Sequence, residues 1–306
     1  MEWNGRPVYY RDTRRATGSR APSIDVVYLN GSDVALPVKW VACTRMYDVT
    51  PPVRGHWHAL LRIAAQQADV ALDCIDHAAP APLTTLWTRA DLAVAFMCGL
   101  PLVTQYPGVR PLVAPVTAIA EDDSPSYRSV WLVRADSAFD TLASTFDHRI
   151  GWTVEHSHSG FNAPRHALLA HRSVRQPRLY RASVGPLHHP RGALAALDED
   201  RIDATAVDAY WWSLLQHHDA ATAFRFRPVG VTASAPMPPL VCAAGFPPAF
   251  AQRLIDVLAV LHEDSDAQIH LDALAVIRFV AIARAAYAPL ADLDRAARAA
   301  GYPLPA

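Results

Sequence analysis

The chain of 306 residues carries 28 Lys and Arg against 29 Asp and Glu, a formal net charge of −1, and 51% hydrophobic residues. These figures describe a globular protein of one or two domains, and they exclude a disordered chain and a global positive field for nucleic acid. Lys39 is the only lysine, so a lysine-containing phosphate loop is excluded and Schiff-base chemistry would depend on that one residue.

Residues 1–36 are predicted to form an N-terminal extension. Residues 1–22 are polar and rich in arginine, and they lack the apolar stretch of roughly 7 to 15 residues that a Sec signal requires. A short strand is predicted over residues 24–29, ahead of the turn signal Asn30-Gly31. No window reaches the roughly 18 uninterrupted apolar residues of a membrane span, so we expect none.

From residue 37 onward, short apolar runs alternate with segments of helical spacing. Apolar runs that predict strands cover residues 38–42, 68–74, 102–104, 112–119, 129–133, 150–154, 179–184, 204–207, 229–233 and 240–244. Helical spacing covers residues 56–67, 139–146, 162–171, 192–198, 210–217, 248–262, 271–286 and 290–300. Strands that alternate with helices form βαβ units, so an α/β fold with mainly parallel sheets is predicted.

The segment His156-Ser157-His158-Ser159-Gly160-Phe161-Asn162 stands between a predicted strand and a predicted helix. The first turn of a helix leaves about four backbone N–H groups without internal partners and carries roughly half a positive charge. Serine hydroxyls add donors there, and Gly160 lets a ligand approach the backbone closely. The turn therefore predicts an anion site, although N-capping by Ser157 or Ser159 explains the same residues without a ligand.

Two further loops are expected at the same edge, because the carboxyl ends of neighbouring parallel strands face one crevice. His188 and His189 follow the strand predicted over residues 179–184, and Asp208 follows the strand over residues 204–207. A histidine can donate to a phosphoryl oxygen, while Asp208 would orient that donor or accept from a ligand amine or hydroxyl. Each of these residues also fits a structural role, such as capping the next helix.

Five short motifs occur in an order that is shared with a known family. They are Met46-Tyr47-Asp48, Cys98-Gly99-Leu100-Pro101-Leu102-Val103-Thr104, Ser126-Tyr127-Arg128-Ser129, Ser157-His158-Ser159-Gly160-Phe161-Asn162-Ala163 and Arg201-Ile202-Asp203-Ala204-Thr205-Ala206-Val207-Asp208. In this order they resemble the phosphate, phosphite and phosphonate group of ABC-transporter substrate-binding proteins. The resemblance covers about residues 38–245, and the ordered set carries it rather than any single motif.

This resemblance implies a type II periplasmic-binding-protein fold, in which two α/β lobes joined by two crossing strands enclose the ligand. Lobe 1 would comprise residues 37–134 and 228–306, and lobe 2 would comprise residues 135–227. The crossings would lie near residues 129–134 and 226–231.

The resemblance also implies which residues hold the ligand, since the family grips phosphonate or phosphate oxygens with a Ser-x-Ser-Gly turn. His158 is bulkier than the small or polar residue that usually occupies the middle position of that turn. The residues implied to bind the ligand are Tyr47, Tyr127, Ser157, His158, Ser159, Gly160, His189 and Asp208, with His188 as the alternative to His189.

The function implied is that of a receptor that captures a small oxyanion, such as a phosphonate, phosphate or phosphite, for an ABC importer. Its partners would be that ligand and an ABC transporter permease, and no cofactor is expected. The family acts in the periplasm, while the lack of a visible signal leaves a cytoplasmic location open.

A soluble enzyme or ligand sensor on the same fold is the alternative, with His158, His189 and Asp208 as acid and base groups.

His156 and His158 would face the same side of an extended strand and share a metal ion. Capping or solvated histidines explain the histidine pairs more simply, so no metal site is predicted. The four cysteines are scattered without C-x-x-C spacing, which predicts neither a zinc site nor a redox pair.

Overall fold

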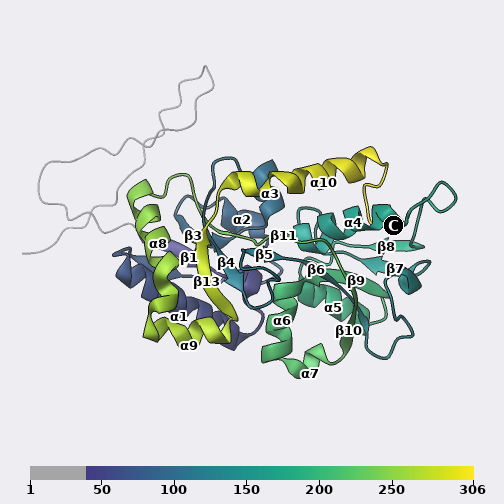
Figure 1. Ribbon diagram of the computed structural model, residues 1–306, viewed down its shortest axis with the longest axis horizontal. Coiled ribbons are helices and arrows are strands. Elements are labelled where there is room, and N and C mark those ends of the chain that lie inside the picture. Colours follow the sequence, from purple (N-terminus) through teal and green to yellow (C-terminus); the bar gives the residue numbers. More distant parts are fainter. Residues whose placement is uncertain (1–38) are drawn as a thin grey trace, which may run out of the picture. The chain divides into compact units, whose positions relative to one another are not determined.

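The computed structural model describes residues 39–306. The predicted extension over residues 1–36, with its strand over residues 24–29, lies outside the described residues. Residues 39–306 form two larger β-sheets with flanking helices (Figure 1). The predicted α/β fold is therefore confirmed.

The first sheet has six strands in the order β13-β4-β12-β3-β1-β2. Strands β1, β2 and β3 run parallel, whereas β12 and β13 run antiparallel to their neighbours. Helix α1 packs against α8 and α9 beside this sheet (Figure 1). The bounds are β1 Trp40–Cys43, β2 Leu72–Cys74, β3 Leu92–Phe96, β4 Arg110–Thr117, β12 Leu240–Cys242, β13 Val276–Ala281, α1 Pro51–Gln67, α2 Leu83–Trp87, α3 Gly99–Thr104, α8 Pro248–Val260 and α9 Ser265–Ala273.

The second sheet has five strands in the order β10-β6-β9-β7-β8. Strand β7 runs parallel to β8 and β9, and β6 runs antiparallel to β9 and β10. The bounds are β6 Ser129–Arg134, β7 Arg149–Gly151, β8 Ala182–Val184, β9 Ala204–Asp208, β10 Phe226–Val231, α4 Ala163–Leu168, α5 Pro190–Asp198, α6 Ala209–His218 and α7 Ala220–Ala223.

The chain passes between the two sheets through segments that are hydrogen-bonded to each other. Strands β6 and β10 pair antiparallel at one edge of the second sheet. Next to them, β5 (Ser126–Tyr127) and β11 (Ala235–Pro236) form a two-stranded ribbon, and β12 of the first sheet follows. Pairing of the two segments fixes where the sheets approach each other.

Helix α10 (Ala288–Ala299) links the two sheets a second time, because it contacts both α3 and α4 (Figure 1). The Asn162 side chain donates to the carbonyl of Leu290 on this helix at 2.9 Å. Arg165 of α4 is fully buried, donates to the carbonyl of Pro303 at 2.9 Å and forms an ion pair with Asp294 of α10. The C-terminal segment thus holds the flank of the second sheet against the first.

The sheets are mixed rather than mainly parallel, which corrects one expectation. Residues 271–286 were expected to form a single helix, but α9 ends at Ala273 and strand β13 begins at Val276. Ala275 has a positive φ of 51°, which breaks the helix, and β13 then pairs antiparallel with β4. The surroundings are rich in alanine, which favours a helix, but Val276-Ile277-Arg278-Phe279-Val280 is rich in the β-branched and aromatic residues that strands favour.

Three smaller expectations also differ from the structure. The apolar run over residues 102–104 belongs to helix α3 instead of a strand. The helix expected over residues 139–146 is reduced to one 3₁₀ turn, Ala143–Thr145, flanked by mutual hydrogen bonds between Thr141 and Ser144. The strand expected over residues 68–74 spans only Leu72–Cys74, since the preceding residues finish helix α1. Within residues 39–306, no helix has the length and apolar character that crossing a bilayer requires.

Gly99→Ala is expected to lower the free energy of unfolding by about 1 to 3 kcal/mol, because a side chain there overfills a packed contact. A Cβ atom at this position would overlap the ring of Tyr287 and lie 2.7 Å from Leu290 Cδ1. Gly55→Ala is the matched control, since Gly55 lies within helix α1 with nothing within 4 Å of the added atom. That control should raise stability by up to about 1 kcal/mol in urea unfolding, and equal effects of the two changes would contradict this account.

Candidate ligand-binding site

A cavity of about 280 Å³ lies between the two sheets. It opens where the carboxyl ends of parallel strands from both sheets face each other, which is where open α/β sheets place ligands. The first sheet contributes Arg45–Asp48 after β1, His77–Ala79 after β2 and Cys98 after β3. The second sheet contributes residues of the loop 153–160 after β7, residues 188–191 after β8, and Asp208 at the end of β9.

Most of the residues expected to bind the ligand line this one cavity, although they come from four separate loops. Two of them do not: the side chains of His158 and Tyr127 lie behind the lining. The expected residues in the lining are Tyr47, Ser157, Ser159, Gly160, His188, His189 and Asp208.

Ser157 both caps the helical segment and keeps a donor for a ligand. Its Oγ accepts from Gly160 N at 3.0 Å, at the start of the π-helical turn His158–Asn162 that continues into α4. A hydroxyl that accepts in this way retains its own hydrogen as a donor. The two explanations of Ser157, capping and anion binding, are therefore compatible.

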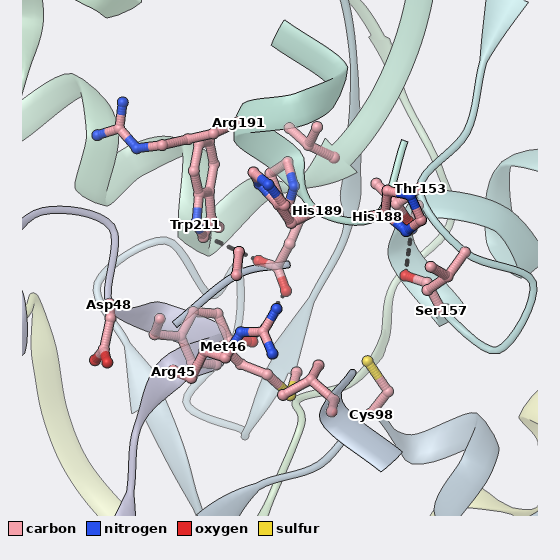
Figure 2. A pocket seen from close by; sticks show the side chains of 18 of the residues that line it. Arg45, Met46, Asp48, Cys98, Thr153, Ser157, His188, His189, Arg191 and Trp211 are labelled. Carbon is pink, nitrogen blue, oxygen red and sulfur yellow. Dashed lines mark hydrogen bonds between the residues drawn. The ribbon is translucent and has the colours of Figure 1, made fainter. Parts of the chain in front are cut away.

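Thr153 adds a hydroxyl that the sequence did not single out. Its Oγ1 is buried and has no hydrogen-bond partner among the described residues. A Cβ atom on Gly160 would overlap this Oγ1, so packing against Thr153 already requires glycine there. Figure 2 shows Thr153 beside Ser157 at the cavity. An unpartnered buried hydroxyl is costly unless a ligand or water completes its bonding.

His158 lies inside the protein, with 1% of its surface exposed. Its Nδ1 lies 3.3 Å from Nδ2 of Asn162, which can only donate, so the ring proton belongs on Nε2. Burial lowers the pKa of His158 to about 4, so the ring is uncharged at neutral pH. Its side chain therefore supports the turn from behind.

Tyr127 also stands behind the serine turn. It is buried, which raises the pKa of its phenol well above the usual range, and the nearby side chain of Ser159 opposes this shift in part.

A buried hydrogen bond joins the two sheets at the cavity. Tyr47, after β1, donates from its hydroxyl to Asp208 Oδ2 at 2.9 Å. Oδ1 of Asp208 accepts from the backbone N–H groups of Tyr210 and Trp211 at 2.8 and 3.0 Å, which caps helix α6. Burial raises the pKa of Asp208 to about 6, although these donors oppose the shift. Asp208 thus has internal donors for both of its oxygens.

His188 and His189 form a strained turn over the second sheet. His188 has a positive φ of 67°, an unusual backbone conformation that functional sites often hold. His189 caps helix α5, and its Nδ1 accepts from Gly192 N at 3.1 Å. That bond places the ring proton on Nε2 and so leaves an N–H donor. The pKa of His189 is lowered by burial and by the charge of Arg45, which faces it from the first sheet.

Three arginines in the lining were missed in the sequence: Arg45, Arg54 and Arg191. Arg45 directly precedes the Met46-Tyr47-Asp48 motif, and Arg191 follows His189 by two residues, so proximity to recognised motifs was the available signal. In Figure 2 the Arg45 guanidinium points into the space below His189, while that of Arg191 extends away from it. The cavity is therefore richer in cations than the motifs indicated.

The contribution of Asp208 to stability should fall as the pH rises from about 4 to about 6, because the pKa of Asp208 is about 6 in the folded protein and 3.8 in the unfolded chain. The folded state then binds more protons than the unfolded state in this interval, a contribution of about 3 kcal/mol. Asp208→Asn should remove this contribution, which is measured as the change in slope of the unfolding free energy against pH in urea unfolding at several pH values.

Asp48→Asn is the companion variant, since burial also raises the pKa of Asp48 to about 6. The double variant should lose more of the slope than either single change. A slope in Asp208→Asn equal to that of the unchanged protein would contradict a buried, protonatable Asp208.

Comparison with solved structures identifies the fold. A binding protein component of an ABC phosphonate transporter from Pseudomonas aeruginosa aligns with a TM-score of 0.71 at 15% identity, covering 86% of this chain and 88% of that one. PhnD1 from Prochlorococcus marinus, in complex with methylphosphonate, aligns with a TM-score of 0.68 at 16% identity, over 86% and 99%. The alkanesulfonate-binding protein SsuA from Xanthomonas axonopodis, bound to MOPS, aligns with a TM-score of 0.56 at 16% identity, over 89% and 96%. The type II periplasmic-binding-protein fold is confirmed.

A family model settles membership. No curated protein matches the sequence. The model of the phosphonate periplasmic substrate-binding proteins of ABC transporters matches residues 88–287, about two thirds of the chain. The matched segment includes the serine turn, His189 and Asp208, whereas Arg45 and Tyr47 precede it. The chain therefore belongs to the phosphonate-binding family of periplasmic substrate-binding proteins of ABC transporters, as the ordered motifs had indicated.

Proposed function

We propose that this protein captures a phosphonate, or a related phosphate-like oxyanion, between its two sheets and delivers it to an ABC importer. The observation that carries the proposal is a cluster of hydrogen-bond donors on the second sheet that line one cavity. Hydroxyls of Thr153, Ser157 and Ser159 lie at or beside a helix start, and the Nε2–H of His189 lies on a neighbouring loop. A phosphonate oxyanion placed against this cluster would accept from several of these donors.

The donors are of the kinds that bind oxyanions tightly. The Ser157 hydroxyl and the Nε2–H of His189 each keep a hydrogen for a charge-assisted hydrogen bond to a ligand. Each such bond contributes about 1.5 to 3 kcal/mol. Several of them support micromolar affinity, about −8 kcal/mol, after part of the gain is spent on bringing the sheets together.

The remaining expected residues take supporting roles in this proposal. Tyr47, held by Asp208, forms a wall of the cavity, and Tyr127 orients the Ser159 hydroxyl. His158 contributes its backbone at the turn, while its side chain packs inside. The two lobes are proposed to close on the ligand by bending at the paired segments β5–β6 and β10–β11.

The ligands bound in two of the similar solved structures favour a tetrahedral oxyanion with an organic substituent. PhnD1 was solved with methylphosphonate, and SsuA, an alkanesulfonate-binding protein, was solved with MOPS. Proteins of the family that this chain belongs to bind their solute without transforming it, so no catalytic step is assigned to His189 or Asp208. The same relationship supports a periplasmic location and an ABC permease as the partner.

Replacing both hydroxyls of the turn, Ser157→Ala with Ser159→Ala, should lower the affinity for methylphosphonate at least about a hundredfold, because two direct donors are lost. Isothermal titration calorimetry with methylphosphonate and with phosphate measures this loss. The free energy of unfolding of the double variant should be lower by only about 1 kcal/mol, because Ser157 also caps the helical segment.

Ser144→Ala is the matched control, because it removes a turn hydroxyl of the second lobe that does not line the cavity. Its affinity for methylphosphonate should equal that of the unchanged protein. Undiminished binding in the double variant would rule out the serine turn as the oxyanion site.

A further inference from the structure

The charged groups around the cavity are not equally satisfied. The two carboxylates in the lining, Asp48 and Asp208, have internal donors: Asp48 accepts from the Thr44 hydroxyl at 2.6 Å, and Asp208 accepts from one phenol and two backbone N–H groups. Burial raises the pKa of both carboxyl groups to about 6. Asp208 therefore offers little to a ligand ammonium group, and Asp48, which is half-buried, has one internal donor.

Two of the three arginines in the lining are also satisfied. Arg54 pairs with Asp76 at 3.1 Å. Arg191 donates twice to the carbonyl of Val49, at 3.1 and 2.7 Å, and lies 3.3 Å from a carboxylate oxygen of Asp219. Arg54 and Arg191 therefore bond to groups of the protein and stabilise the loops beside the cavity.

Arg45 differs, because no carboxylate in the described part of the chain lies within 4.0 Å of its guanidinium. One of its terminal nitrogens donates to the carbonyl of Ala81. Burial lowers the pKa of Arg45, which reflects partial loss of solvation. A guanidinium has five N–H donors, so several remain for a ligand.

The size of the cavity leaves room for a second group on the ligand. At about 280 Å³ it is close to the lower end of small-molecule sites, roughly 300 to 1,000 Å³, and exceeds the needs of one tetrahedral oxyanion. The serine turn lies on the second sheet, and Arg45 lies on the first, facing His189. A ligand that spans the two would present one anionic group to each.

Building on the proposed function, we propose that Arg45 recognises a carboxylate carried on the organic substituent of the ligand. The preferred ligands are then carboxylated phosphonates rather than aminoalkyl- or simple alkylphosphonates. A planar guanidinium matches a carboxylate with two parallel hydrogen bonds, which a lysine ammonium does not reproduce. Arg45 is the specificity-determining residue, and the serine turn holds the phosphonate.

The test compares phosphonoacetate, methylphosphonate and 2-aminoethylphosphonate by isothermal titration calorimetry on the full chain. Phosphonoacetate should bind at least about tenfold more tightly than methylphosphonate, and 2-aminoethylphosphonate should bind no better than methylphosphonate. Arg45→Met should abolish the preference for phosphonoacetate while changing the affinity for methylphosphonate less than about threefold. Arg45→Lys, which keeps the charge, should retain part of the preference.

Arg62→Met is the control for net charge, because Arg62 is exposed on helix α1 and does not line the cavity. It should leave all three affinities unchanged. A preference for 2-aminoethylphosphonate, or an equal loss for all three ligands in Arg45→Met, would overturn the inference and leave the proposed function standing. If methylphosphonate does not bind and the serine variants have no effect, the proposed function itself fails.

Discussion

The carboxylate of Asp208 ties the two halves of the molecule together at the cavity. It ends strand β9, caps helix α6 through two backbone N–H groups, and accepts the hydroxyl of Tyr47 from the first sheet. A buried carboxylate is costly unless donors surround it, so its partners are constrained in position. Because the partners come from both sheets, this one group sets the relation of the loops that line the cavity.

The electrostatic balance of the site follows from which groups have partners. Asp48 and Asp208 accept hydrogen bonds from other groups of the protein. Within residues 39–306, Arg45 makes few hydrogen bonds and the hydroxyl of Thr153 makes none. A site with surplus donors attracts acceptors, and an oxyanion supplies several at once. The same loops hold the histidine turn, in which the capping bond from Gly192 to His189 directs the remaining ring N–H away from the helix.

Helices and strands with a clear period of apolar residues were predicted well. Elements whose conformation depends on contacts with distant segments were not. Helix α6 and strand β9 agree with expectation within a residue or two. Strand β13 was missed because its alanine-rich flanks mimic a helix, while pairing with β4 and burial of Val276 and Phe279 determine its conformation. Local preference decides a conformation only where tertiary contacts do not oppose it.

The sequence by itself determined the α/β class, the family and seven of the residues that line the cavity, because strand ends and capping serines are local features of the chain. Only the tertiary structure decided that His158 and Tyr127 stand behind the turn, and that Thr153 and Arg45 face the cavity. Which side of a turn faces a ligand depends on packing against distant segments, such as α10 behind Asn162. Whether an arginine can bind a ligand depends on the same packing. Its N–H groups remain available only when the fold brings no acceptor group close to them.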